Sequence, residues 1–212
     1  MTDSADSIGN LPMIPEGDGF DDREQDGRII KGVLLKCTDG RWAGPDGLPA
    51  PTIPLLAVRV MTIVQQWLDK KPIETIIKEK GKDWPDVDAL NEAIPRSEWE
   101  IGIDGQPRRP WQVQRVVYLV EEKTAERFTY ANRTVGANIA VSDLKARVAD
   151  MRFMTGDDTV LPVVELASAP MKTRFGLKIR PEFRVTSWRT ASGASRLEPL
   201  PTQKLFRDAI AF

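Results

Sequence analysis

Apolar and polar residues alternate through most of positions 29 to 189, with the two-residue period of β-strands. Segment 55–68 also fits one face of a helix, but its many β-branched residues favour a strand that turns at 69–71 and pairs with residues 73–77. Segment 171–189 fits either one long strand or a hairpin that turns at Gly176. The other predicted strands cover residues 29–37, 97–103, 113–120, 127–135 and 160–166.

Two short helices are predicted between the strands. Asp86 is placed to cap a short helix that Pro95 ends. Ser142 is predicted to cap a second helix, which runs to about residue 152 and turns an apolar stripe toward the sheet. Gly136, which precedes this helix, is interpreted as a bulge or turn. The predicted stripe consists of Leu144, Val148 and Met151.

The order of elements predicts a mainly β, α+β protein. From Trp111 onward the order is strand, strand, helix, strand, strand, and one of the earlier strands completes a set of five. This order matches a partly open, OB-like barrel with a helix after its third strand. A two-layer α+β sheet is the alternative. The predicted organisation is a disordered acidic tail over residues 1–27, one β-rich domain over 28–190, and a C-terminal extension over 191–212.

Composition excludes several kinds of chemistry. The 212 residues contain no histidine and one cysteine, Cys37, so the chain cannot build a Ser-His-Asp triad, a Cys-His pair or a His-ligated zinc site. With a single cysteine it cannot form an internal disulfide either, which favours a cytoplasmic location. The longest uncharged run of the apolar part, residues 47–58, contains three prolines and is too short to span a membrane. We therefore expect no cofactor, no metal and no membrane association.

The overall charge of −1 hides an uneven distribution. Residues 1–27 hold eight acidic residues and one base, Arg23, for a net charge of −7, whereas the rest of the chain carries +6. An acidic tail on a basic body is typical of proteins that bind nucleic acid or protein partners. A tail that only improves solubility fits the same numbers equally well.

The strongest candidate site is the basic segment 171–189. As a strand, it places apolar residues at odd positions, which predicts a core face, and basic residues at even positions, followed by Trp188. Cations beside aromatic rings are what single-stranded nucleic-acid grooves use, because the charges follow phosphates and the rings stack on bases. A solvated strand face with Trp188 at the edge of the core is the alternative. The predicted phosphate contacts are Lys172, Arg174, Lys178, Arg180 and Arg184.

Two weaker groupings accompany this segment. Arg108, Arg109 and Trp111 form a second basic, aromatic cluster that is also predicted to contact nucleic acid. Phe128 and Tyr130 alternate on one strand face and could stack on bases, but core packing is the favoured interpretation. Asp83, Asp86 and Asp88 could ligate magnesium in a nuclease, although a helix cap explains Asp86 better.

Several short stretches resemble uncharacterised proteins encoded by tailed phages and prophages of proteobacteria. The stretches are Pro107-Arg-Arg-Pro-Trp111, Phe128-Thr-Tyr-Ala-Asn-Arg-Thr-Val-Gly-Ala137, Met171-Lys-Thr-Arg-Phe-Gly176, Arg180-Pro-Glu-Phe183 and Trp188-Arg189. The resemblance covers roughly residues 28–190. It implies a phage context and carries no assigned activity.

These observations predict a non-enzymatic protein that binds single-stranded DNA and assists replication, recombination or repair. The acidic tail is expected either to compete with nucleic acid for the basic face or to recruit replication or recombination proteins. A phage structural or host-interaction protein that binds an acidic protein surface is the second hypothesis. A metal-dependent nuclease is the third.

Overall fold

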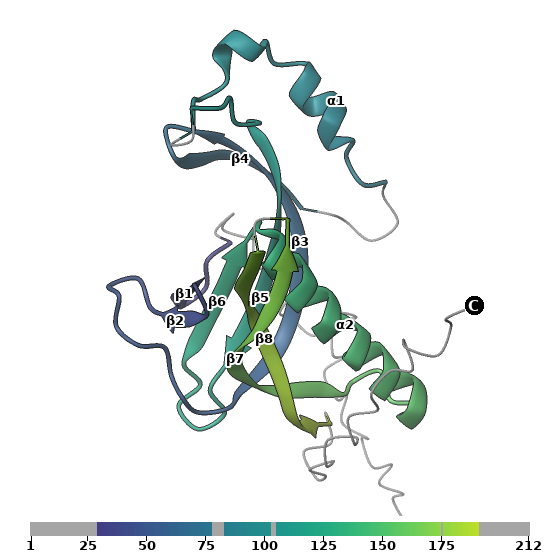
Figure 1. Ribbon diagram of the computed structural model, residues 1–212. Helices are drawn as coiled ribbons and strands as arrows, with labels where there is room; N and C mark the ends of the chain where they lie inside the picture. The colour runs from purple at the N-terminus through teal and green to yellow at the C-terminus, as the bar shows by residue number, and fades with distance from the viewer. Residues whose placement is uncertain (1–28, 78–82, 103–104, 175, 191–212) are drawn as a thin grey trace, which may run out of the picture.

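The computed structural model describes residues 29–77, 83–102, 105–174 and 176–190. The predicted acidic tail and C-terminal extension lie outside the described residues. Within them, eight strands and two α-helices follow one another along the chain (Figure 1). The elements are β1 (Val33–Thr38), β2 (Arg41–Ala43), β3 (Leu55–Leu68), β4 (Lys71–Ile77), α1 (Val87–Glu92), the 3-10 turn η1 (Arg96–Glu98), β5 (Trp111–Val120), β6 (Arg127–Asn132), α2 (Val135–Thr155), β7 (Leu161–Thr173) and β8 (Gly176–Arg189).

The strands form one curled sheet in the order β2-β1-β6-β5-β3-β7-β8, with β4 paired to β3. Of the paired strands, β1 and β6 run parallel and the rest antiparallel. The two ends of the sheet approach each other, because the Trp42 indole N–H on β2 donates a 2.7 Å hydrogen bond to the Ala167 carbonyl oxygen on β7. The protein is therefore mainly β, and the sheet curls into the predicted OB-like, partly open barrel (Figure 1).

Most of the predicted elements are confirmed. Segment 55–68 is the strand β3, and a turn at Asp69 and Lys70 leads back into β4. From Trp111 onward, the chain follows the predicted order as β5, β6, α2, β7 and β8. Segment 171–189 contains a hairpin, since β7 ends at Thr173 and β8 begins at Gly176. Phe175 lies outside the described residues.

The strand predicted at residues 97–103 is wrong. The chain instead makes the 3-10 turn η1, and only Ile101 forms an isolated bridge, to Pro107. The indole N–H of Trp99 donates a 3.0 Å hydrogen bond to the Ile94 carbonyl oxygen. This hydrogen bond spans only five residues, so a local side-chain contact just after α1, and not strand pairing, fixes the segment.

The second helix begins earlier than predicted. Its cap is Thr134, whose hydroxyl oxygen accepts a hydrogen bond from the Ala137 backbone N–H at 3.2 Å, and Ser142 lies exposed in the helix interior. Gly136 belongs to the first turn of α2 rather than to a bulge. A Cβ at this position would lie 2.8 Å from the Arg180 Cβ, so the missing side chain lets β8 pass close to the helix.

The main core lies between α2 and the concave side of the sheet. Leu144 and Met151 are buried there and Val148 packs against them, which confirms the predicted stripe. Phe128 and Tyr130 are also buried, as favoured from the sequence. The rings of Trp42, Tyr130 and Phe183 pack around one another with centroids 5.1 to 5.5 Å apart.

Leu144→Ala should destabilise the protein, because Leu144 is fully buried between α2 and the sheet. We expect the free energy of unfolding to fall by about 2–5 kcal/mol, the usual range for a buried leucine. Chemical denaturation measures this decrease. The exposed neighbour Lys145→Ala serves as the control, and an equal effect of both substitutions would contradict the packing of α2 described here.

An upper layer extends from one end of the barrel (Figure 1). It consists of the outer ends of β3 and β5, the strand β4, and the short helix α1. Asp86 caps α1 as predicted, accepting hydrogen bonds from the backbone N–H groups of Asp88 and Ala89. The Asn91 side chain fastens α1 to β5 through hydrogen bonds of 2.9 and 3.0 Å to the Trp111 backbone.

Candidate nucleic-acid interface

The predicted alternation of core and basic positions holds for only part of β8. Phe183 and Val185 are buried at odd positions, and Lys178 and Arg184 are exposed at even ones. Between Val185 and Ser187 the pairing with β7 shifts by one residue. This bulge turns Trp188 into the core, where 3% of its surface is exposed. The prediction that Trp188 stacks on bases is therefore wrong.

Some basic residues of the β7–β8 hairpin are held in ion pairs, and others are exposed to solvent. Arg180 is half-buried, and its guanidinium lies 3.0 Å from the Asp143 carboxylate on α2. Arg184 lies 3.5 Å from the carboxylate of Glu182 on its own strand. Lys172, Arg174 and Lys178 are exposed near the tip of the hairpin. The hairpin thus exposes basic side chains near its tip, whereas Arg180 and Arg184, further from the tip, form ion pairs.

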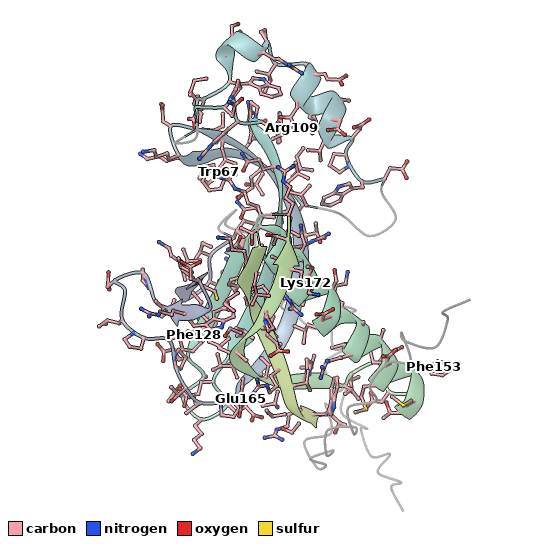
Figure 2. All side chains as sticks on the ribbon, viewed as in Figure 1. Trp67, Arg109, Phe128, Phe153, Glu165 and Lys172 are labelled. Carbon is pink, nitrogen blue, oxygen red and sulfur yellow. The ribbon has the colours of Figure 1, made fainter. Side chains whose placement is uncertain are left out.

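Trp111 is likewise unavailable for stacking. Only 6% of its surface is exposed, and its backbone is hydrogen-bonded to Asn91 of α1. Its predicted neighbours Arg108 and Arg109 are exposed and precede β5 in the upper layer. Figure 2 shows Arg109 in this layer together with a different tryptophan, Trp67, at the outer end of β3.

Trp67 and the two arginines line a groove of about 470 Å³ between the upper layer and the barrel. β3 supplies Trp67, the segment before β5 supplies Arg108 and Arg109, and the end of β6 leads to Arg133. Polar amide side chains complete much of the lining, notably Gln112, Gln114 and Asn132. The groove therefore combines cations, an aromatic ring and hydrogen-bonding amides.

Two arginines of the groove have no carboxylate partner in the described part of the chain, namely Arg108 and Arg133. The Arg133 guanidinium lies 5.9 Å from the centre of the Trp67 ring. Burial, together with the positive charge of Arg108, lowers the pKa of Arg133. Two like charges thus line the same groove, an arrangement that an anion in the groove would stabilise.

Two other charged groups of the groove have partners. Arg109 forms an ion pair with Asp88 of α1. Glu98 and Glu100 also line the groove, and Glu100 accepts a hydrogen bond from the Asp69 backbone N–H. Among the described residues, these interactions leave Arg108, Arg133 and Lys70 as groove cations without an ion pair, and of the three Arg133 lies beside the Trp67 ring.

Two residues of the groove lining each carry a buried polar atom without a hydrogen-bond partner among the described residues. The Trp67 Nε1–H and the Gln112 Oε1 are buried and lack a hydrogen-bond partner within the described ranges. Buried polar atoms are normally paired, so a bound molecule that supplied an acceptor and a donor here would be stabilised. Gln114, 8% exposed, adds a third buried polar side chain to the lining.

Trp67, Arg133 and the amides are not distinguished as a site by the sequence. A bulge between Gln66 and Trp67 breaks the alternation of β3, so its periodicity does not assign Trp67 to a face. Arg133 is separated from Trp67 by 66 residues of sequence, and only the pairing of β3, β5 and β6 brings them together. The one local signal is the Arg108-Arg109 pair.

A second, more apolar groove of about 670 Å³ lies between α2 and strands β3 and β7. Val58, Val148 and Leu161 line it, and Phe153 at its edge is 89% exposed (Figure 2). A large aromatic side chain in water beside an apolar groove is typical of a protein contact surface. This feature bears on the second hypothesis from the sequence.

The candidate magnesium ligands do not form a metal site in the structure. Asp86 uses its carboxylate to cap α1, and Asp88 pairs with Arg109. Among the described residues, no three acidic or cysteine side chains are grouped so that they could hold a metal ion. The nuclease hypothesis therefore has no candidate metal centre in this part of the chain.

No protein family, no curated protein and no solved structure matches the chain. The resemblance to phage-encoded proteins therefore stays a prediction. Within the described ranges, neither helix combines the length and the apolar character needed to cross a membrane.

Proposed function

We propose that the protein binds single-stranded DNA in the groove between the barrel and the upper layer. The observation that carries this proposal is the pair Arg108 and Arg133, which lack carboxylate partners in the described part of the chain and line one groove, with Arg133 beside the Trp67 ring. The arginines would bind phosphates, and the indole would stack on a base. Gln112, Gln114 and Asn132 would hydrogen-bond to base edges.

A single strand suits this groove better than a duplex. The faces of bases in a duplex are already stacked on one another, so Trp67 could not reach them without unpairing the helix. The amide side chains are likewise placed to meet base edges that pairing would occupy. Binding should therefore discriminate strongly in favour of unpaired DNA.

The basic tip of the β7–β8 hairpin would extend the path of the strand. Arg133 immediately precedes the cap of α2, and Gly136 in the first turn of α2 contacts Arg180 of β8. The groove and the hairpin thus meet at the start of α2, whose N-terminus adds a partial positive charge. Lys172 and Lys178 would contact phosphates beyond the groove.

The biological role that follows is accessory and non-enzymatic. A protein of this kind would protect or present single-stranded DNA during replication, recombination or repair. The resemblance to phage-encoded proteins suggests that this takes place in the cytoplasm of an infected cell.

A polarisation titration with labelled single-stranded and double-stranded oligonucleotides at two salt concentrations tests the proposal. We expect tighter binding of the single strand, and weaker binding of both at the higher salt concentration. Equal or stronger binding of the duplex, or no binding at low salt, would refute it. Added magnesium should leave the oligonucleotides intact, whereas cleavage would favour a nuclease.

The apolar groove supports a second candidate function, the binding of another protein. The observation in its favour is Phe153, which lies in water at the edge of the apolar groove. Phe153→Ser should leave DNA binding unchanged if the two surfaces act separately. An interaction protein without affinity for DNA would show no response in the oligonucleotide titration.

A further inference from the structure

The described chain begins beside the arginine groove. Ile29 is buried against Ile63 and Val116, and its carbonyl oxygen accepts a 2.8 Å hydrogen bond from the Tyr118 hydroxyl. Two residues later, Lys31 is fixed to the Thr129 hydroxyl through both its backbone N–H and its carbonyl oxygen. The point at which residues 1–28 join the fold is therefore firmly anchored.

The positions of Ile29 and Lys31 relative to β6 show the direction in which residues 29–31 cross the sheet. Lys31 lies level with Thr129 on β6, whereas Ala131, two positions further along β6, packs against the cluster that holds Ile29. The next residues of β6 lead to Asn132 and Arg133, which line the groove. The chain therefore crosses the sheet from the groove side toward Thr129.

Gly32 permits this approach. Its φ is +73°, and a Cβ at this position would overlap the Arg127 carbonyl oxygen. The turn at Gly32 reverses the chain, so that β1 runs parallel to β6 whereas residues 29–31 run in the opposite direction, away from the groove.

The groove and Ile29, where the described chain begins, lie on the same face of the sheet. Gln114, which lines the groove, pairs with Ile63, and Ala131, also in the lining, pairs with Val116. Ile63 and Val116 are the residues on which Ile29 packs. Ile29 thus contacts residues that pair directly with residues of the groove lining.

The segment that joins at this point is strongly acidic. Five of the eight acids in residues 1–27 fall within nine positions that end three residues before Ile29. At about 3.3–3.6 Å per residue, even the last few of these acids can reach a neighbouring groove. The five acids are Asp18, Asp21, Asp22, Glu24 and Asp26.

We propose that the acidic segment 18–26 of this chain docks in the arginine groove when no nucleic acid is bound. Its carboxylates would contact Arg108 and Arg133, two arginines of the groove that form no ion pair within the described ranges. Because the segment is tethered beside the groove, its local concentration is high and weak ion pairs are enough to hold it. The inference that this docking regulates DNA binding rests on the proposed function.

Paramagnetic relaxation in the full-length chain tests the docking without DNA. A nitroxide is attached at Gly19→Cys in a Cys37→Ser background, and the indole N–H signal of Trp67 is observed, with the signal of the buried Trp188 as reference. We expect selective broadening of the Trp67 signal at low salt. High salt should remove most of the effect, because it screens exposed charges.

The decisive comparison is between the labelled chain with its acidic segment intact and the same chain with that segment neutralised. The same labelled chain carrying Asp21→Asn, Asp22→Asn and Glu24→Gln should show much less broadening at Trp67. Equal broadening in both chains would overturn the proposal, because proximity through the tether alone would then explain it.

A DNA titration measures the regulatory consequence. The three neutralised acids should tighten single-strand binding by about threefold or more, since the competent, open groove becomes more populated. The matched control neutralises three exposed acids of the body, Asp46→Asn, Glu126→Gln and Asp150→Asn, and changes the net charge equally. Equal gains in the two variants would show a general charge effect and refute regulation by docking.

The two proposals fail in different ways. If no variant binds DNA, the proposed function is wrong, and the relaxation experiment still decides whether the segment docks. If DNA binds but the Trp67 signal is broadened equally in the intact and the neutralised chains, the docking is wrong and the proposed function stands.

Discussion

Replacement of Arg108 and Arg133 together by alanine is expected to weaken single-stranded DNA binding by at least about tenfold, because each arginine supplies a charge-assisted hydrogen bond to phosphate. The slope of log affinity against log salt should fall by up to about 0.7 for each phosphate that is no longer neutralised. Polarisation titrations at several salt concentrations measure both quantities, and circular dichroism checks that the variant is folded.

The matched control replaces two exposed arginines outside the groove, Arg41→Ala and Arg147→Ala. It changes the net charge equally and should have a much smaller effect. The pair Lys172→Ala and Lys178→Ala tests the hairpin tip. If this pair weakened binding more than the groove pair did, the main site would lie on the hairpin, as the basic pattern of segment 171–189 predicts.

Trp188→Ala is expected to lower the free energy of unfolding by about 3–5 kcal/mol, because the indole is almost fully buried in the core. Trp67→Ala should instead mainly affect DNA binding. It should weaken single-strand binding by about 1–3 kcal/mol, because a stacking surface is removed. Chemical denaturation and DNA titration of both variants separate these effects. The assignment of the two tryptophans would be reversed if Trp188→Ala impaired binding while leaving stability unchanged.

Periodicity is sufficient to predict most strands. The alternation of β3, the two-sided apolar character of β5 and the hairpin of β7 and β8 all follow from short-range pattern. The predicted start of α2 is misplaced because Thr134 and Ser142 are both acceptable caps, and the close passage of β8 over Gly136 is a tertiary feature.

The faces of the strands are harder to predict than the strands themselves. One extra residue near Thr186 turns Trp188 inward, and one irregularity after Gln66 affects the facing of Trp67. A strict two-residue period has no signal for either bulge. Trp188, the tryptophan that the sequence favours for stacking, is therefore buried, and the sequence does not single out Trp67, which lines the groove.

Charge counting has a similar limit. The sequence shows how many cations a segment holds, but their partners come from distant positions. Arg180 pairs with Asp143, 37 residues away, and Arg189 pairs with Glu122, 67 residues away. Arg108 and Arg133 stand out only after such pairs have been identified in the fold.

The basic tip of the β7–β8 hairpin also has a consequence for self-association. β8 is the outermost strand in the sheet order, and near the tip it exposes Leu177 and Ile179. An apolar edge strand invites pairing with another molecule, and charged residues or proline discourage it. Lys178 lies between the two apolar residues, and Pro181 lacks the N–H needed to extend the ladder. We therefore expect the charge at the tip to oppose β-aggregation through this edge, so that a neutral tip shortens the time that concentrated protein stays in solution.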